Sequence, residues 1–336
     1  MKTGRTLKAA ILTAFAACLF SPLLRAGALP TDIIGMFPQN VGEFAYADLR
    51  QARGLTWFPQ LQDQMLPARF RQFEQFLASA GIDPNLQVEE LAWALVPGGL
   101  PSGAAANTAI PTSEEVVGIA LGNFRPEAAE VFFRAQKLPV VKVRTFSLYA
   151  FGSGSGQGDL FFTFIDSNTA AFGQRAQLEK LIAVRYGEEP GLMNNQELSP
   201  LITQANGTGV VWVVMNSAYT RLAMRQLTPD VAQFPQAQQL IAKLRAMTIG
   251  ITAAKGVDAH FQAVCATPDD ANTFAALLQA GLLYRRYQIG NSNPDLAAML
   301  DETRVTPSGD RLDIRLSLTD AQIVALIRRN TFAIKF

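Results

Sequence analysis

The same order of strands and helices occurs twice along this chain of 336 residues. In each half, an apolar strand is followed by helical segments, two further strands, a second helix, closing strands and a last helix. We expect the strands of the first half at residues 43–49, 91–97, 116–122, 140–151, 159–165 and 169–173. Those of the second half are expected at residues 209–215, 247–253, 257–265, 302–306 and 311–318. This alternation predicts an α+β fold with two units.

Short sequence matches between the halves favour an internal duplication. The matched pairs, which occur in the same order in both halves, are 70–79 with 234–243, 126–132 with 268–274, and Gly158-Asp159 with Gly309-Asp310. Each half begins with the order βαββαβ of the ferredoxin-like fold. We predict two tandem ferredoxin-like units, each with an extra hairpin strand and helix, over residues 29–206 and 207–336. The alternative is two unrelated α+β units whose helices have similar compositions.

The first 28 residues have the three parts of a secretory signal peptide. A positively charged start without acidic residues precedes an apolar run over residues 9–24. Ala26 and Ala28 then form the small-x-small pattern that a signal peptidase recognises, so Leu29 is the expected first residue of the mature protein. We therefore expect an exported protein that is periplasmic or secreted.

Two other interpretations of this N-terminus remain open. Residues 15–18, Phe-Ala-Ala-Cys, resemble a lipobox, in which Cys18 would carry a lipid anchor. The apolar run could also stay attached, although its 16 residues, interrupted by Pro22, are short for a bilayer that needs about 20. All three interpretations imply export. After residue 28 no apolar run approaches the length of a membrane span.

Charge argues against a nucleic-acid partner. The whole chain has 29 basic and 28 acidic residues, and the signal peptide contains four of the basic ones. The mature protein therefore has 25 basic and 28 acidic residues, a net charge near −3. Its basic residues form no cluster longer than a pair. A nucleic-acid-binding surface or a polybasic membrane patch would require such a cluster.

The counts of cysteine and histidine exclude further classes of protein. Cys265 is the only cysteine after the signal peptide and His260 is the only histidine in the chain. No intrachain disulfide can form, and one residue of each kind cannot make a structural zinc site. We expect no metal and no cofactor. The mature protein must be stabilised by the packing of its core.

Motifs for catalysis are also missing. The glycine-rich segment 152–158 does not fit G-x-G-x-x-G and lies between two strands, so it predicts a hairpin loop. Four acidic pairs occur, but neighbouring side chains point to different sides of a helix or strand. These pairs are Glu89-Glu90, Glu114-Glu115, Glu188-Glu189 and Asp269-Asp270. We predict no catalytic residue.

The strongest functional signal is a polar sheet face in the second half. The strands of the first half are apolar on both faces, whereas those of the second half alternate between apolar and polar residues. Alternation places Cys265 on the apolar face, where it is expected to be buried, and His260 on the opposite face. The polar face predicts either a solvated surface or an interaction surface formed by Asp258, His260, Gln262, Asp313 and Arg315.

Several short motifs resemble a group of exported bacterial proteins of unknown function. They are Gly81-Ile82-Asp83-Pro84 after a helix, Gly122-Asn123-Phe124 before a helix, and Ala170-Ala171-Phe172-Gly173 and Arg185-Tyr186-Gly187 around another helix. The resemblance spans about residues 44–190. It implies neither an activity nor functional residues.

Three functions remain compatible with the sequence. The first is an exported, non-catalytic binding or assembly protein of the cell envelope, with an unidentified envelope protein as its partner. The second is a carrier of a lipid or another apolar ligand, which requires an apolar pocket lined by strands and helices. The third is a hydrolase whose carboxylates come from distant parts of the chain.

The signal-peptide pattern makes the first testable prediction. N-terminal sequencing of the protein purified from its native envelope fraction should give a sequence beginning at Leu29. A chain that begins at Met1, or at a lipid-modified Cys18, would contradict cleavage after Ala28.

Overall fold

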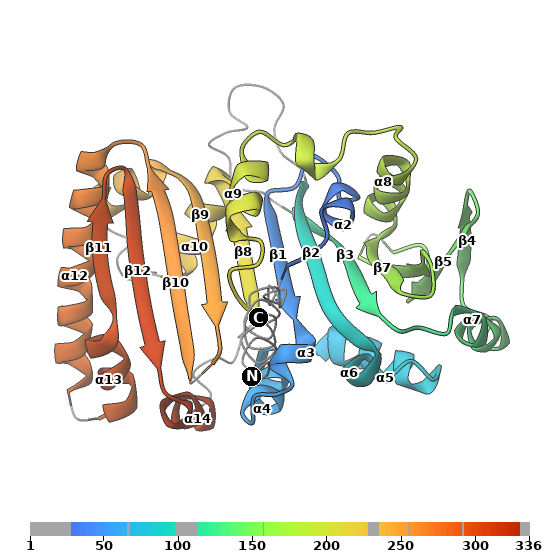
Figure 1. The fold of residues 1–336 in the computed structure, drawn as a ribbon, viewed down its shortest axis with the longest axis horizontal. Coiled ribbons are helices and arrows are strands. Elements are labelled where there is room, and N and C mark those ends of the chain that lie inside the picture. The colour runs from blue at the N-terminus through green and yellow to red at the C-terminus, as the bar shows by residue number, and fades with distance from the viewer. Residues whose placement is uncertain are drawn as a thin grey trace, which may run out of the picture.

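The computed structural model describes residues 28–65, 68–98, 113–156, 158–227, 235–254, 256–290 and 292–329. Within these ranges, twelve strands form one sheet in the order β11-β12-β10-β9-β8-β1-β2-β3-β7-β6-β5-β4 (Figure 1). The strands are β1 (Glu43–Asp48), β2 (Val88–Gly98), β3 (Ser113–Gly122), β4 (Val140–Val143), β5 (Phe146–Phe151), β6 (Leu160–Phe164), β7 (Thr169–Gln174), β8 (Val211–Met215), β9 (Leu244–Thr252), β10 (Val257–Cys265), β11 (Arg304–Ser308) and β12 (Arg311–Leu318). All neighbouring strands are antiparallel.

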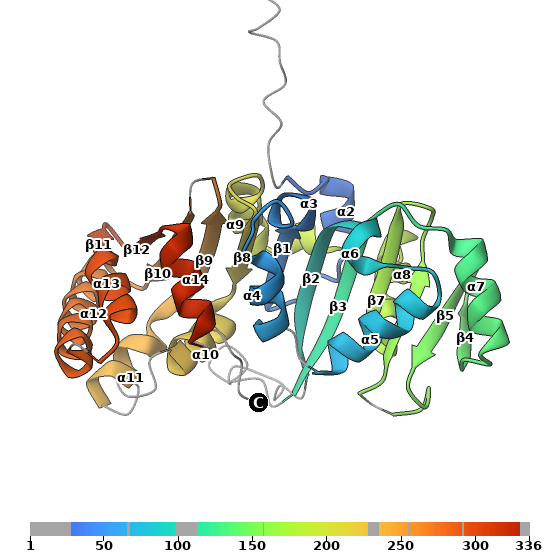
Figure 2. The ribbon, with the colours of Figure 1, turned by 90° about the horizontal axis from the view of Figure 1, so that it is seen from below.

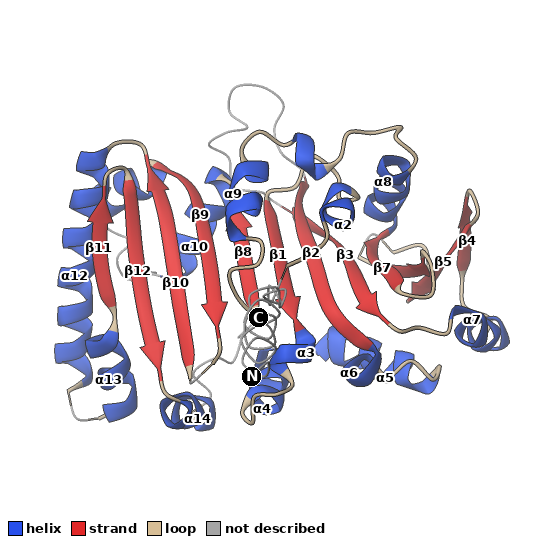
Figure 3. Cartoon of the chain, in the orientation of Figure 1, coloured by secondary structure: helices blue, strands red, loops and turns tan. Residues whose placement is uncertain are grey.

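Helices connect the strands and lie over the faces and at the ends of the sheet, as Figure 3 shows. They are α2 (Thr31–Gly35), α3 (Leu49–Ala52), α4 (Phe58–Met65), α5 (Ala68–Ser79), α6 (Pro84–Gln87), α7 (Pro126–Ala135), α8 (Arg175–Arg185), η2 (Leu192–Asn194), α9 (Leu198–Ala205), α10 (Ser217–Leu227), α11 (Pro235–Ala242), α12 (Pro268–Ile289), α13 (Pro294–Glu302) and α14 (Asp320–Arg328). The α+β class is therefore confirmed. None of the helices in the described ranges combines the length and apolar character needed to cross a bilayer.

The two halves of the chain meet at the centre of the sheet, where β1 pairs with β8. Outward from β8 the strand order is β9-β10-β12-β11, and outward from β1 it is β2-β3-β7-β6. The connecting helices also correspond, because α7 and α12 follow β3 and β10, and α8 and α14 follow β7 and β12. The first half has β5 and β4 in addition. The expected boundary at residues 206 and 207 lies in the loop before β8.

The ferredoxin-like prediction is wrong. In that fold a third strand lies between the first two, whereas here β2 pairs directly with β1 and runs antiparallel to it. The helices from α3 to α6 return the chain to the end of the sheet at which β1 finishes (Figure 1), so β2 begins there. The predicted strand 140–151 is in fact the hairpin β4–β5, because Arg144 has a left-handed backbone with φ of 56°.

Apolar clusters lie on both faces of the sheet, and Figure 2 shows helices on either side of it. We call the face that carries Tyr46 and Trp212 face A, and the face that carries Leu95 and Val213 face B. Over the first half and the centre, face A is covered by α2, η2, α8 and α9. Face B is covered by α5 and α7 in the first half and by α10, α11 and α12 in the second. Trp57, near the start of α4, packs with α14 in a separate cluster.

The predicted start of the mature protein is held in place. The backbone N–H of Leu29 donates to Asn206 Oδ1 at 2.8 Å, and Asn206 Nδ2 donates to the carbonyl oxygen of Leu29 at 2.9 Å. The side chain of Leu29 is buried in the core on face A. Ala28 is the first described residue, and residues 1–27, including Ala26 and the lipobox residue Cys18, lie outside the described residues.

A partly buried carboxyl group lies at the central strands. Glu43 is the first residue of β1, and its neighbours in register are Leu95 of β2 and Met215 of β8. Burial, and secondarily the negative charge of Glu114, raise the pKa of Glu43 from 4.5 to about 7. The folded state therefore favours the protonated form of this carboxyl group. Its contribution to stability is complete below about pH 4.5 and is lost as the pH rises through 7.

We predict that Glu43→Gln removes this pH dependence. Between pH 5 and pH 8 the free energy of unfolding of the wild type should fall relative to that of the variant, by at most about 3 kcal/mol. Urea unfolding of both proteins at the two pH values measures the difference. If the free energy of unfolding changed equally in both proteins between pH 5 and pH 8, Glu43 would be ionised without penalty in the folded state.

Candidate functional site

The first candidate site is an apolar cavity between α5 and face B of the sheet. Its volume is about 180 Å³. The walls come from helices α3 to α6 and strands β2, β3, β6 and β7. The lining residues are Leu49, Gln62, Phe73, Glu74, Leu77, Ile82, Pro84, Asn85, Val88, Leu91, Ala120, Phe124, Phe162, Phe164, Ala170, Ala171 and Phe172. Apolar side chains thus form nearly the whole surface.

Small and large side chains together create this space. Ala120 of β3 and Ala170 of β7 have small side chains, so they leave space between the sheet and α5. Contacts between aromatic rings hold α5 above the sheet. The rings of Phe73 and Phe162 have centroids 5.7 Å apart. Phe172 lies over Gly118, where a Cβ atom would overlap its ring. A substitution at Gly118 would therefore displace one wall of the cavity.

The polar residues of the lining form a small group. The side-chain amide of Gln62 donates to Glu74 Oε1 and to Asn85 Oδ1, both at 3.4 Å. The carboxyl group of Glu74 is partly buried, and this burial raises its pKa. Leu86, next to this group on α6, has 76% of its surface exposed. An amphipathic ligand would find apolar walls with a few polar groups beside them.

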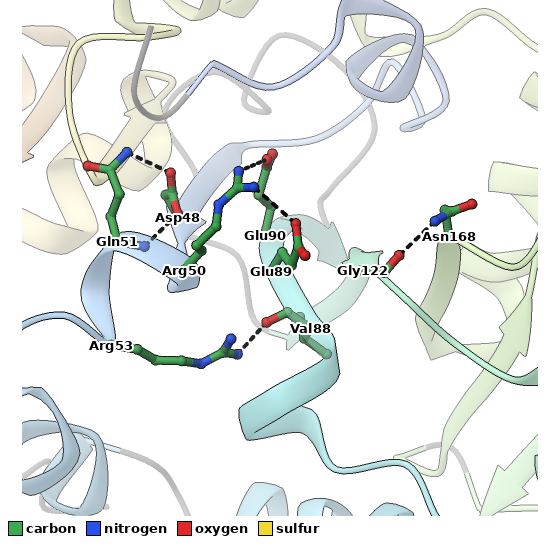
Figure 4. Close-up of polar contacts among 9 residues, drawn as sticks. All are labelled: Asp48, Arg50, Gln51, Arg53, Val88, Glu89, Glu90, Gly122 and Asn168. Atoms are coloured by element: carbon green, nitrogen blue, oxygen red, sulfur yellow. Dashed lines mark hydrogen bonds and ion pairs between the residues drawn. The ribbon is translucent and has the colours of Figure 1, made fainter. Parts of the chain in front are cut away.

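Polar contacts fix the segments that form one wall (Figure 4). Arg50 of α3 donates to Glu89 at 3.2 Å and to Glu90 at 3.4 Å. Arg53 donates to the carbonyl oxygens of Pro84, at 3.0 Å, and of Val88. These bonds attach α3 to the start of β2. The wall is therefore positioned before any ligand arrives.

Two further hydrogen bonds fix the neighbouring turns (Figure 4). Asp48 caps α3 by accepting the backbone N–H of Gln51 at 2.9 Å. Across the sheet, Asn168 Nδ2 donates to the carbonyl oxygen of Gly122 at 3.0 Å, which fixes the β6–β7 turn against the end of β3.

The chemistry of this cavity favours binding. Among the described residues of its lining, Glu74 is the one titratable side chain, and none of them carries a hydroxyl, thiol or imidazole group. Covalent catalysis needs a nucleophile beside a base, and glycoside hydrolysis needs a second carboxyl group. These walls can enclose an apolar group but provide no partner for Glu74 in such reactions.

The second candidate site is the part of face A formed by β9, β10 and β12. The polar residues predicted from the sequence lie here, where cross-strand neighbours place His260 beside Arg315 and Gln262 beside Asp313. His260 Nε2 and Asp313 Oδ1 are 2.7 Å apart. Gln262 donates to the same oxygen at 3.1 Å and accepts from Arg311. The four side chains form one continuous polar network across two strands.

A hollow of about 340 Å³ adjoins this network. Among the predicted residues, Asp258, His260 and Arg315 line it, whereas Gln262 and Asp313 do not. Gly250 and Thr208 contribute to the lining on the side of β9 and the loop after α9. Because Gly250 has no side chain, the space above β9 at this position stays open. The polar face is thus concave and partly exposed to solvent.

Other residues singled out in the sequence have structural roles. Cys265 is buried, as predicted, and burial followed by the charges of Asp270 and Asp310 raises the pKa of its thiol to about 11. In the glycine-rich loop, the carboxylate of Asp159 accepts the backbone N–H groups of Gly154 and Gly156. A phosphate group would need these same donors. The acidic pair Asp269-Asp270 begins α12, where Lys243 binds Asp270 at 2.5 Å.

Substitution of His260 tests how much the polar network contributes to the free energy of unfolding. The side chain of His260 is 41% exposed and is hydrogen-bonded to Asp313. We predict that His260→Ala lowers the free energy of unfolding by less than about 1 kcal/mol. Chemical denaturation should contrast this variant with Trp212→Ala, which empties a core position and should cost about 3–5 kcal/mol. Failure of His260→Ala to fold would contradict a solvated role for the imidazole.

Comparison with known proteins found no matching protein-family model and no similar curated protein. Two crystal structures of TP0453 resemble the chain. Crystal form I has a TM-score of 0.46 and 12% sequence identity, and the alignment covers 92% of this chain and 100% of TP0453. Crystal form IV has a TM-score of 0.48 and 12% identity, with coverage of 89% and 96%. We draw no functional conclusion from a similarity at this level.

Proposed function

We propose that this chain is an exported, non-catalytic binding protein whose ligand inserts an apolar group into the cavity beneath α5. The observation that carries this proposal is the composition of the cavity, which is lined by five phenylalanines and several aliphatic residues. The cavity is partly open to solvent, and its apolar walls favour an apolar group because burying that group removes apolar surface from water. The function is thus the carriage or capture of an apolar ligand.

The volume limits what the cavity can hold. An engineered apolar cavity of about 150 Å³ takes up benzene, and this cavity is slightly larger at about 180 Å³. It therefore fits one aromatic ring or a short stretch of an acyl chain. A larger lipid would extend past Gln62, Glu74 and Asn85, whose polar groups suit the more polar part of an amphipathic molecule.

A hydrolase is less well supported. Paired catalytic carboxyl groups are expected to have pKa values shifted in opposite directions. The clearest interacting pair in the described residues is Glu43 and Glu114, and burial raises the pKa of both. Neither residue lines the apolar cavity or the polar hollow.

The open part of face A supports a second candidate function, which is assembly with an envelope protein. The observation in its favour is the polar hollow, where Arg315 lies beside His260 and Asp258 without a covering helix in the described residues. A partner with complementary charge could occupy this surface without competing for the apolar cavity. The two functions are therefore compatible in one molecule.

We also infer that the halves descend from a duplicated unit. In support, both halves have the same strand order outward from the β1–β8 pair and place corresponding helices after corresponding strands. Two of the three short sequence matches lie in corresponding elements, since 70–79 and 234–243 fall on α5 and α11, and 126–132 and 268–274 begin α7 and α12. The third match does not, because Gly158-Asp159 precedes β6 and Gly309-Asp310 precedes β12. An experimental structure in which residues 44–186 and 209–329 fail to superpose would contradict this inference.

The cavity can be tested by filling it. Ala170→Phe places a ring in the space above β7 and should reduce binding of the apolar fluorophore N-phenyl-1-naphthylamine at least tenfold. Ala135→Phe adds the same ring at an exposed position of α7 and is the matched control. Native mass spectrometry of the purified wild type should show a bound apolar molecule that Ala170→Phe lacks.

Overpacking costs about 1–3 kcal/mol, so thermal unfolding must first show that Ala170→Phe is folded. Equal fluorophore binding by the folded variant and the wild type would exclude the cavity as the binding site. If Ala170→Phe does not fold, Leu77→Phe fills the cavity from α5 and provides the same measurement.

A further inference from the structure

Helix α12 lies at the outer end of the second half, alongside edge strand β11 (Figures 1 and 2). It spans 22 residues, which corresponds to about 33 Å. Its inner side is anchored near the N-terminus by Ala271, Phe274 and Ala275, which belong to the core on face B. Its outer side is not covered by another element in the described residues.

This outer side carries an apolar stripe. Leu283, Tyr284 and Tyr287 have 72%, 64% and 86% of their surfaces exposed. Ala276 and Ala280 are also exposed and precede them at helical spacing, so these five residues lie along one side of α12. We call them the α12 stripe. Three of the seven large apolar side chains exposed in the described residues lie within it.

The stripe is not interrupted by charge. Arg286, which follows Tyr284 by two positions, turns toward α13 and binds Asp301 at 3.0 Å. An exposed apolar patch with helical spacing is suited to binding another helix.

We propose that the stripe binds the α12 helix of a second copy of this chain, packed antiparallel about a twofold axis at Ala280. This geometry places Tyr284 opposite Ala276 and Leu283 opposite Leu277, and the two copies of Ala280 face each other. Tyr284 thus meets a small side chain, Leu283 packs against another leucine, and the small residue at the axis lets the helices approach closely. One helix supplies both complementary surfaces, as a twofold interface requires.

Charge favours the same arrangement. The first turn of α12 carries Asp269 and its last turns carry the exposed Arg285. In an antiparallel pair, the acidic end of each helix lies toward the basic end of the other, and the helix dipoles oppose one another. The two copies of Arg285 lie on opposite sides of the axis, about 15 Å apart along the helices, so they do not repel at close range.

The area is sufficient for a reversible dimer. At roughly 200 Å² for each large side chain, the exposed parts of Leu283, Tyr284 and Tyr287 amount to about 400 Å² per copy. A pair would bury about 800 Å² through these residues, and Ala276, Leu277 and Ala280 bring the total near the ~1,000 Å² typical of a specific interface. We therefore expect dimerisation in roughly the micromolar range.

Sedimentation equilibrium of the full mature chain over a range of concentrations tests this proposal. The wild type should pass from monomer to dimer, and Leu283→Glu should weaken the dimer at least tenfold because it buries a charge at the seam. Leu86→Glu changes an equally exposed leucine on α6 and should dimerise like the wild type. A wild type that remains monomeric, or a Leu283→Glu variant that dimerises equally well, would overturn the proposal.

Cysteine substitution tests the register. Two copies of Ala280→Cys meet at the axis and should form a disulfide-linked dimer on mild oxidation. Ala276→Cys places the thiols on opposite sides of the axis and should cross-link at least tenfold more slowly. Equal cross-linking of both variants would refute the antiparallel register, and the buried Cys265 of the wild type provides the background rate.

Discussion

The pairing of β1 with β8 holds the molecule together. It joins the two halves of the chain into one twelve-stranded sheet and aligns Tyr46 with Trp212 on face A. Their rings stack with centroids 5.5 Å apart, and both side chains are fully buried. The buried residues of the helices that cover face A belong to the same apolar cluster as this ring pair. Without the β1–β8 pairing, each half would expose an apolar strand edge and half of a shared core.

Local pattern was sufficient to locate most of the strands. Alternation also placed Cys265 on an apolar face and His260 on a polar one, because successive side chains of a strand point to opposite faces of the sheet. It did not reveal the break within residues 140–151, where Arg144 adopts a backbone conformation that its residue type rarely takes. Nor could it choose the neighbours of β1, since strand pairing depends on contacts between distant residues.

The apolar cavity could not be predicted from the local sequence pattern for the same reason. Its floor comes from Ala120 and Ala170 and its roof from Phe73 and Leu77, which lie far from the floor residues in the sequence. The abundance of phenylalanine, with 22 in the chain, signals a large aromatic core but does not show where that core is incompletely filled. By contrast, alternation within β10 and β12 was sufficient to predict the polar face, because a single sheet face forms it, but it did not predict the hollow.

The β1–β8 pair has a consequence for the order in which the chain can fold. Phe44 and Val214 are neighbours across this pair although 170 positions separate them in sequence. During synthesis or translocation, β1 has β2 on one side but must wait for β8 on the other. A contact so distant in sequence forms slowly, because a long loop must close first. The first half therefore stays incomplete until most of the chain is present.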